Sequence, residues 1–393
     1  MKIRGIGMKK STANLSYCLI HASMWGMYAV IIYFANDFLK AQGLSGGMCS
    51  LVLGITAAAS VLLNIGVSEL IKRTQKVKLY VTTMLLAALI LLGLGGMLLS
   101  SKVLALAGIC LVLTLLQLAP GMCNSLGMDA IAKGAPATYA VARGIGSVAF
   151  ATVSLCAGNL IARFGEGAIP AVGGTMAAIL ILTVLWFHNC VEQHLPETVT
   201  APKEAGVKVK DNFLAKKPMF TVFLLGAALM NISHYYLVVF LGNITDSLSL
   251  GKDVQGAAAA VSTYVELPIM LGFAFLTRKM RCNNLLRISC FMFLLKCLGM
   301  TFADSAMDIY LAHATQIVGY GLYAIASVTY AGEVMGKEDA VRAQSYLAGT
   351  ISIGNVVAMS TGGFMSVDVM LWVSTGCAAI GALIVLLTAK KPQ

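Results

Sequence analysis

The chain has 393 residues, of which 58% are hydrophobic and only 11% are charged. Because soluble domains carry about 25% charged residues, this composition excludes an ordinary soluble domain and predicts a chain embedded in a membrane along its whole length. The formal net charge of +11 does not indicate a nucleic-acid partner, since the basic residues fall in short segments between apolar runs.

Runs of at least ~17 residues with few charges predict helices that span a bilayer. The first run follows a basic N-terminus and is full length, so we interpret it as a membrane helix and not as a removed signal peptide. The ninth run is interrupted by Lys296. In chain order the predicted spans are 14–37, 47–70, 79–99, 103–127, 143–162, 168–188, 218–242, 254–277, 284–303, 307–331, 345–366 and 369–389.

A polar, Lys- and Glu-rich segment at 189–217 separates the first six spans from the last six. This predicts an all-α polytopic membrane protein with two six-helix bundles, at 1–188 and 218–393, joined by a linker. A shift of 204 positions superposes Asp129 on Glu333, each in the loop after the fourth span of its half. Such a repeat is typical of transporters that bind substrate between their two halves.

The basic residues are distributed unequally between the two sides of the predicted membrane. The side that holds the N-terminus takes 23 of the 28 Lys and Arg residues, and the other side takes four, with Lys296 remaining. Since positive charge accumulates on the cytoplasmic side, both termini and the central linker are expected in the cytoplasm. The predicted location is therefore the cytoplasmic (inner) membrane.

Glu266 is the single charged residue in a run of 24 residues, Val254 to Thr277. At ~1.5 Å per residue this run spans a bilayer and places the carboxyl group near its centre. An ionised side chain there costs at least ~2.5 kcal/mol, so intramembrane acids usually belong to a proton or substrate pathway. Pro268 favours a kink close by. We expect Glu266 to carry protons; the alternative is a structural acid satisfied by a neighbouring helix.

Lys296 is the predicted partner of Glu266. It lies in the uncharged stretch from Ile288 to Ala303, ~12 Å of helix from either end. The eighth and ninth helices are joined by a short loop and should be antiparallel neighbours, which would bring both side chains to one depth. The alternative is a lysine that reaches the interface from a short, tilted helix.

Other polar and aromatic residues are candidates for lining a cavity. Arg143 opens the fifth helix and Asp129 closes the fourth, where ordinary interfacial charges are also typical. Each of the remaining candidates, taken alone, is more typical of a packing or membrane-interface residue. They are Trp25, Tyr28, Gln117, Asn231, His234, Tyr236, Gln316 and Tyr320.

The sequence contains no motif that predicts catalysis. The ten cysteines stand singly, without the Cys/His spacing of a zinc site. A glycine-rich phosphate loop, a GxSxG elbow and an HExxH helix are all missing from the sequence. We therefore expect no enzymatic activity, no cofactor and no metal.

With twelve spans, a central linker and these membrane charges, the chain resembles the major facilitator superfamily. Within it, the chain is most similar to the branch of lactose permease and related proton-coupled sugar or nucleoside symporters. This resemblance implies two pseudo-symmetric bundles that work by alternating access. A degenerate form of the superfamily's loop signature after the second helix implies a cytoplasmic gating loop that contains Gly66, Glu69, Lys72 and Arg73.

The fifth-helix segment ARGIGSVAF is similar to the permease segment in which an arginine binds sugar hydroxyls and an aromatic residue stacks on the ring. The similarity implies that Arg143 binds hydroxyls, that Phe150 stacks, and that Asp129 partners Arg143. Glu266 matches the eighth-helix acid that couples binding to proton movement. Lys296 matches a basic residue of the ninth helix.

The chain also departs from lactose permease. Gln316 and Gly319 occupy the tenth-helix positions of a histidine and a proton-carrying glutamate, and the seventh helix lacks the permease's acids. A copied lactose mechanism is therefore not expected. If protons are coupled, Glu266 must take a larger share of the task, with Asp129 as a second candidate.

These features together predict a symporter of a small, neutral, hydroxyl-rich solute of the sugar or nucleoside class. Its expected partners are the substrate, protons and the lipid bilayer, and it is expected to function as a monomer. The nearest alternative is a proton-driven exporter of amphipathic compounds or drugs. A less favoured alternative is a membrane sensor that binds a solute without transporting it.

Overall fold

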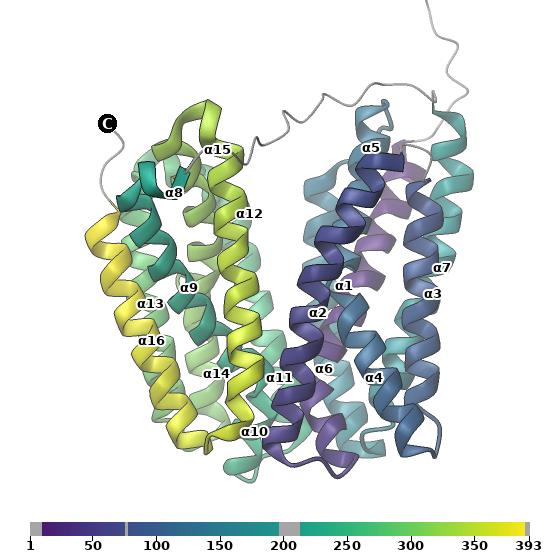
Figure 1. Cartoon of the computed structure of the whole chain (residues 1–393), viewed down its shortest axis with the longest axis horizontal. Coiled ribbons are helices and arrows are strands. Elements are labelled where there is room, and N and C mark those ends of the chain that lie inside the picture. Colours follow the sequence, from purple (N-terminus) through teal and green to yellow (C-terminus); the bar gives the residue numbers. More distant parts are fainter. Residues whose placement is uncertain (1–9, 75–77, 196–212, 390–393) are drawn as a thin grey trace, which may run out of the picture. The chain divides into compact units, whose positions relative to one another are not determined.

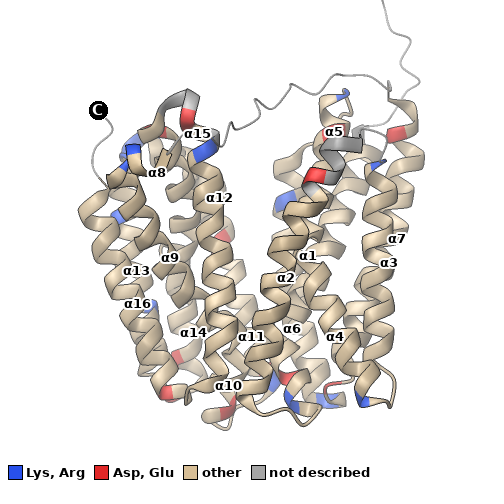
Figure 2. Cartoon of the chain, in the orientation of Figure 1, with Lys and Arg blue, Asp and Glu red and all other residues tan. Residues whose placement is uncertain are grey.

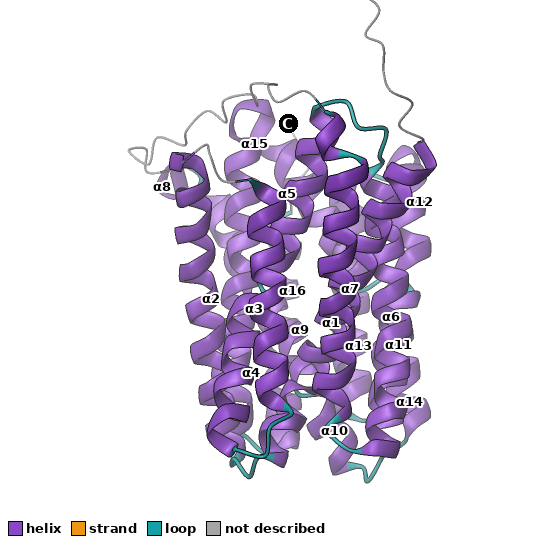
Figure 3. Ribbon diagram, turned by 90° about the vertical axis from the view of Figure 1, so that its right-hand side faces the viewer, coloured by secondary structure: helices purple, strands orange, loops and turns teal. Residues whose placement is uncertain are grey.

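The computed structural model describes residues 10–74, 78–195 and 213–389, which form helices and loops with no strand among them (Figure 3). Charged residues gather towards the helix ends, and the middles of the helices carry few (Figure 2). The side chains of Leu62, Val103 and Leu271 are 72%, 75% and 85% exposed. Such exposed apolar surface suits contact with lipid. The predicted all-α membrane fold is confirmed.

The chain divides into two compact units, and unit 1 consists of residues 1–43 and 56–205 (Figure 1). Its helices are α1 (Lys10–Ala41), most of α2 (Gly46–Thr74), α3 (Leu79–Met97), α4 (Lys102–Leu116), α5 (Ala119–Ala132), α6 (Tyr139–Phe164) and α7 (Ala168–Cys190), followed by the single turn η1 (Glu192–His194). α1 is the central helix of the unit and packs mainly against α6 and α7. α3 packs against α4 and α7.

Unit 2 consists of residues 44–55 and 206–393. Its helices are α8 (Phe213–Lys216), α9 (Pro218–Val239), α10 (Leu241–Ser247), α11 (Lys252–Tyr264), α12 (Glu266–Lys279), α13 (Cys282–Thr301), α14 (Ala306–Ala314), η2 (Thr315–Ile317), α15 (Tyr320–Thr361), η3 (Gly362–Phe364) and α16 (Val367–Thr388). α9 packs against α15 and α16, and α13 packs against α15 and α16. The boundary after Ala205 lies inside the predicted linker; the domain limits at 188 and 218 stay a prediction.

The first turns of α2 belong to unit 2, where they lie against the end of α15. Ser50 Oγ accepts a hydrogen bond from the Gly363 backbone N–H at 2.6 Å. A Cβ at Gly46 would lie 2.7 Å from the carbonyl oxygen of Gly363. This close approach of two backbones requires glycine at both positions.

In the described part of the chain, nine helices or continuous helix pairs are long and apolar enough to cross a membrane, and the bent pair α4–α5 makes a tenth. The other two passes are the tenth and eleventh predicted spans, which α14, η2 and α15 form. Tyr320 and Thr350 are separated by about 45 Å along a straight helix. Both nevertheless hydrogen-bond the side chain of Asn231. α15 therefore turns back on itself, as its arch in Figure 1 shows.

Proline breaks two of the predicted spans. The break in the eighth span was predicted from Pro268, and the break in the fourth span was not predicted. The fourth span was predicted to be continuous, but it bends by 40° between α4 and α5. α4 ends at Leu116, four residues before Pro120, and α11 ends at Tyr264, four residues before Pro268. A proline has no N–H for the carbonyl four residues earlier and its ring clashes with that carbonyl, which ends the helix there. The break at Val265 agrees with the kink predicted from Pro268.

The tenth span was also predicted to be continuous, and it is interrupted without a proline. α14 ends at Ala314, a single turn of tighter helix follows, and α15 begins at Tyr320. Gly319 precedes α15, and a Cβ there would lie 3.3 Å from the backbone nitrogen of Phe293 in α13. The interruption therefore depends on tertiary contacts that a hydropathy pattern does not record.

Candidate functional site

The polar residues of unit 2 converge on the interruption of the tenth pass. The side-chain amide of Gln316 bridges Glu266, at the start of α12, and Lys296, in α13. Gln316 Nε2 donates to Glu266 Oε1 at 2.6 Å, and Gln316 Oε1 accepts from Lys296 Nζ. Lys296 and Gln316 are 1% and 4% exposed, whereas Glu266 is partly exposed. Glu266 is thus the accessible end of a polar chain that leads to a buried base.

The orientation of the Gln316 amide follows from what its two neighbours can donate and accept. A lysine ammonium has donors only, so the amide oxygen must face Lys296 and the amide NH2 must face Glu266. The NH2 group needs an acceptor, which a carboxylate supplies. Hydrogen bonds to ionised groups are about twice as strong as neutral ones, so the bridge favours an ionised Glu266 and a protonated Lys296. The pair predicted from sequence is therefore indirect, with Gln316 between its members.

Gly321 gives Glu266 the space that this arrangement needs. Gly321 lies in the first turn of α15, beside the side chain of Glu266. A Cβ at Gly321 would lie 2.7 Å from Glu266 Cγ, which is too close for any real contact. The carboxyl group reaches Gln316 because this position has no side chain.

A second polar group lies in the same unit around Asn231 of α9. Tyr320 Oη donates to Asn231 Oδ1 at 2.8 Å, and Asn231 Nδ2 donates to Thr350 Oγ1 at 3.0 Å. The His234 ring stacks on Tyr320 with centroids 3.5 Å apart, and Phe293 lies 5.8 Å from Tyr320, centroid to centroid. The predicted residues Asn231, His234 and Tyr320 are therefore brought together, and Gln316, four residues before Tyr320 in the chain, belongs to the bridge between Glu266 and Lys296.

The candidate residues of unit 1 form an aromatic cluster around Arg143 of α6. The Arg143 guanidinium lies over the Trp25 ring, 4.2 Å from its centroid, and Arg143 Nη1 donates to Ser147 Oγ at 2.7 Å. The Trp25 ring is 5.5 Å from the ring of Tyr28 and 6.3 Å from that of Phe150. All four predicted residues are partly exposed, so they form an accessible aromatic surface with a fixed positive charge.

Two further contacts hold this aromatic cluster in place. Tyr28 Oη donates to Gln117 Oε1 at 2.9 Å, and Gln117 lies at the bend between α4 and α5. A Cβ at Gly146 would lie 2.5 Å from Trp25 Cδ1, so Gly146 lets α6 approach the indole closely. The unexpected bend in the fourth pass therefore positions one hydrogen-bond partner of the cluster.

Two predicted site residues make contacts elsewhere. The resemblance implied that Asp129 partners Arg143, but Asp129 Oδ2 instead pairs with Lys133 Nζ at 2.6 Å, one turn along α5. An ion pair at this spacing forms within one helix and needs no neighbour. Tyr236 Oη hydrogen-bonds Thr361 Oγ1 at 2.6 Å, away from Asn231 and Gln316. The structure thus corrects the expected pairing of Asp129.

The predicted gating loop is helical in its described part. Gly66 and Glu69 are exposed residues of α2, and nothing lies within 4 Å of the position of a Cβ at Gly66. α2 continues through Lys72 and Arg73 to Thr74. The side chains of Lys72 and Arg73 lie outside the described residues, so the gating role stays a prediction.

Two polar residues of the clusters and one buried histidine of α14 were missed in the sequence. Thr350 hydrogen-bonds Asn231, and Ser147 hydrogen-bonds Arg143. Both lie in predicted spans, where a small hydroxyl side chain is indistinguishable from a packing residue in the sequence. His313 of α14 is 2% exposed, and its Nδ1 donates to the Ile309 carbonyl at 2.9 Å. A histidine inside the predicted tenth span was the available signal. Within the described ranges, no three His, Cys, Asp or Glu residues are grouped so as to hold a metal ion.

Comparison with known proteins identifies a family and a fold. A family model described as "MFS_1 like family" matches residues 103–373. The structure is similar to the crystal structure of the nucleoside transporter NupG, with a TM-score of 0.76 and 13% identity over 96% of this chain and 99% of that chain. Comparison with curated proteins gives no match.

Two inward-facing transporter structures are also similar. One is a bacterial homologue of the iron transporter ferroportin, with a TM-score of 0.72 and 11% identity over 97% of this chain and 98% of that chain. The other is a bacterial homologue of the human lysosomal transporter Spinster in its unoccupied form. It has a TM-score of 0.68 and 15% identity over 97% of each chain. At such identities these similarities establish the fold alone.

Proposed function

Because the chain belongs to the MFS_1-like family of the major facilitator superfamily, we propose that this multi-pass secondary transporter is a proton-coupled symporter of a neutral, hydroxyl-rich solute. Sugars and nucleosides have that chemistry. The observation that carries the proposal is the Gln316 bridge between the partly exposed Glu266 and the buried Lys296. Ionisable residues within membrane spans are costly and usually belong to a functional site. Glu266 is such a residue, and Gln316 connects it by hydrogen bonds to the basic side chain of Lys296.

The bridge supplies a means of coupling protonation to conformation. With Glu266 ionised, the chain from Glu266 through Gln316 to Lys296 joins α12, η2 and α13 by charge-assisted hydrogen bonds. A proton on Glu266 removes the negative charge, weakens its bond to Gln316 and leaves Lys296 without an opposing charge. The three segments are then released to move. A proton thus biases a two-state equilibrium, as alternating access requires.

The side chains around these groups support a neutral, hydroxyl-rich substrate. Trp25, Tyr28 and Phe150 offer aromatic faces on which a sugar or base ring can stack. The Arg143 guanidinium offers donors for hydroxyl groups. Asn231 is 2% exposed and its amide already bonds Ala227, Thr350 and Tyr320, so it holds Tyr320 in place. A phosphorylated substrate would require more positive charge than Arg143 supplies. The similarity in fold to a nucleoside transporter is consistent with this class.

We further propose that the protein lies in the cytoplasmic membrane as a monomer, with both termini and the linker in the cytoplasm. This orientation follows from the excess of Lys and Arg on the side that holds the N-terminus. Glu266, Lys296 and Asn231 lie in unit 2, and Arg143 and Phe150 lie in unit 1. Unit 1 thus holds the proposed hydroxyl-binding and stacking residues, and unit 2 holds the proposed proton-coupling residues.

Transport into sealed vesicles tests the proposal. Purified protein is reconstituted, an inward proton gradient is imposed, and labelled sugars and nucleosides are offered in turn. We expect at least one to accumulate above its external concentration and to leak out when a protonophore removes the gradient. Intact cells give the direction: loss of label from energised cells would favour the exporter of amphipathic compounds. Binding without any transport would favour a sensor.

A further inference from the structure

We propose that unit 2 carries a binding site for an anionic phospholipid at the end where α8 meets α9. The site is a cavity of about 280 Å³. It is separate from the Glu266 and Asn231 groups, and the proposal does not depend on the transported solute. The lining residues that carry it are Lys216, Lys217, Met219, Phe220, Phe223 and Val334.

The walls of the cavity are mostly apolar, with Tyr330 and Thr388 as their polar members, and its rim is basic. Phe220 and Phe223 of α9 are buried, and Val334 comes from α15. Lys216 and Lys217 are exposed at the rim, side by side in the chain. These surfaces complement a phospholipid, whose hydrocarbon chain would contact the apolar wall and whose phosphate would contact the two lysines. A soluble phosphate compound would need no apolar wall.

The two lysines are held at the rim by the packing of α8. Phe213 is 4% exposed and stacks on Tyr346, with centroids 5.6 Å apart and planes 5° from parallel. The guanidinium of Arg342 lies over the same ring, 5.3 Å from its centroid. Thr221 Oγ1 donates to the Leu214 carbonyl at 2.8 Å. α8 is therefore a fixed part of unit 2, and the position of the lysines is set by it.

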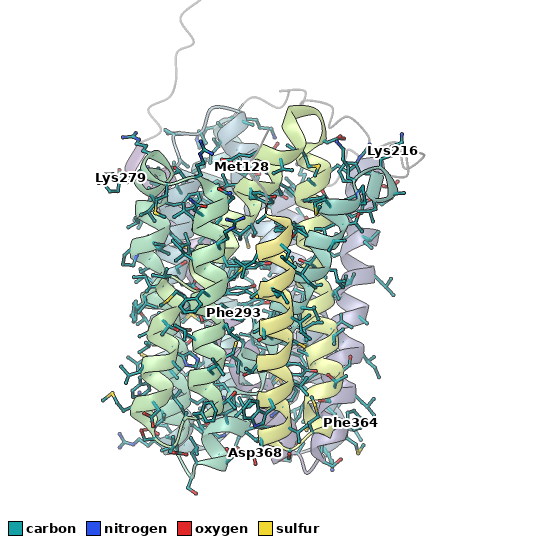
Figure 4. The ribbon with its side chains drawn as sticks, turned by 90° about the vertical axis from the view of Figure 1, so that its left-hand side faces the viewer. Met128, Lys216, Lys279, Phe293, Phe364 and Asp368 are labelled. Carbon is teal, nitrogen blue, oxygen red and sulfur yellow. The ribbon has the colours of Figure 1, made fainter. Side chains whose placement is uncertain are left out.

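The location suits the anionic face of a membrane. Lys216 and Lys279 lie at one end of unit 2, and Phe364 and Asp368 lie at the other (Figure 4). The end with Lys216 is the basic one, which the distribution of Lys and Arg assigns to the cytoplasm. Basic pockets between helices on that side of a membrane bind anionic headgroups. The first turn of α9 adds the positive end of a helix dipole beside the rim.

The test compares lipids in detergent-purified protein. Phosphatidylglycerol, phosphatidylcholine and inorganic phosphate are each titrated, and bound lipid is counted by native mass spectrometry while Tm is followed. We expect phosphatidylglycerol to bind more tightly than phosphatidylcholine and to raise Tm by mass action, with no shift from phosphate. An equal shift with inorganic phosphate would indicate a soluble anion site and overturn the proposal. Equal binding of the two lipids would overturn it too.

Two variants and their controls locate the site. Lys216→Gln/Lys217→Gln should weaken phosphatidylglycerol binding roughly 30-fold, since each lysine near the surface contributes about 1 kcal/mol. Arg278→Gln/Lys279→Gln removes the same charge from the same end of unit 2 and should retain the affinity. An equal loss in both pairs would show that only net charge matters, contrary to the proposal.

The apolar wall is tested separately. Val334→Phe places a ring in the cavity and should weaken binding while both lysines remain. Val328→Phe, on the same helix and 44% exposed outside the cavity, is its control. Unchanged phosphatidylglycerol binding in Val334→Phe would show that the acyl chain does not enter the cavity, which would overturn the site.

Discussion

At the scale of single residues, Gln316 decides how Glu266 and Lys296 affect one another. A buried ammonium is costly unless its donors are satisfied, and Gln316 Oε1 provides an acceptor within the described structure. The same amide donates to Glu266, so neither charged residue is independent of it. An apolar residue at position 316 would separate the two charges and leave each in a less favourable environment.

This chemistry predicts an order of stabilities. Gln316→Leu should destabilise the protein by about 1–3 kcal/mol, because it removes an acceptor from a buried donor. Gln316→Leu/Lys296→Leu should recover part of that loss, because the buried charge is gone. Gln117→Leu is the matched control. It removes an amide that accepts a hydrogen bond from Tyr28, a neutral side chain, and should therefore have a smaller effect on stability. Thermal unfolding in detergent measures all three. A double variant less stable than Gln316→Leu would contradict the bridge.

The sequence predicted how deep these residues lie in the membrane, but not which neighbouring helix their side chains face. Hydropathy places Glu266 and Lys296 near the middles of their spans, because a charge interrupts an apolar run visibly. It does not show which face of a helix a residue occupies relative to a neighbour. For this reason Gln316 was recognised as polar but not as the bridge, and Asp129 was assigned to Arg143 when its partner is Lys133.

At the scale of helices, the interruptions of the membrane passes place the polar groups. The break at Val265 puts Glu266 at the start of α12, and the interruption before Tyr320 puts Gln316 opposite it. Pro268, four residues after the end of α11, explains the first, and this proline could be read from the sequence. The second depends on Gly319 and Gly321 fitting against α13 and Glu266, a tertiary contact without a local signal.

Gly321 provides the test at this scale. Gly321→Ala would place a Cβ 2.7 Å from Glu266 Cγ and force the carboxyl group away from Gln316. We expect proton-coupled uptake to fall roughly 10- to 100-fold, as small misplacements of reacting groups commonly cause. Gly349→Ala, in the same helix and with nothing within 4 Å of its Cβ position, should leave uptake unchanged. Equal uptake by the two variants would show that the position of Glu266 does not limit coupling.

At the scale of the whole molecule, the twelve passes and the fold class followed from composition and hydropathy. Long apolar runs permit few structures other than membrane helices. The fold-back of α15 agrees with separate tenth and eleventh spans, although its helix continues through the turn. The short helices α8 and α10 were not foreseen, because each depends on packing at the ends of unit 2.

The orientation of the molecule is a separate prediction. An epitope inserted after Ala205 should bind antibody only when the cytoplasmic side is accessible, and one inserted after Leu250 should bind from the opposite side. The excess of Lys and Arg around the linker supplies the physical reason. Antibody binding in intact and permeabilised cells distinguishes the two sites. Exposure of the linker epitope on intact cells would contradict the orientation.

The central claim is that Glu266 carries the proton that couples transport, and proton flux during solute entry tests it most directly. In vesicles containing a pH-sensitive dye, addition of a transported solute should acidify the lumen with the original protein. Glu266→Gln should abolish this acidification and uphill accumulation while retaining exchange of labelled for unlabelled solute. Solute-driven acidification of normal size in Glu266→Gln would contradict the account.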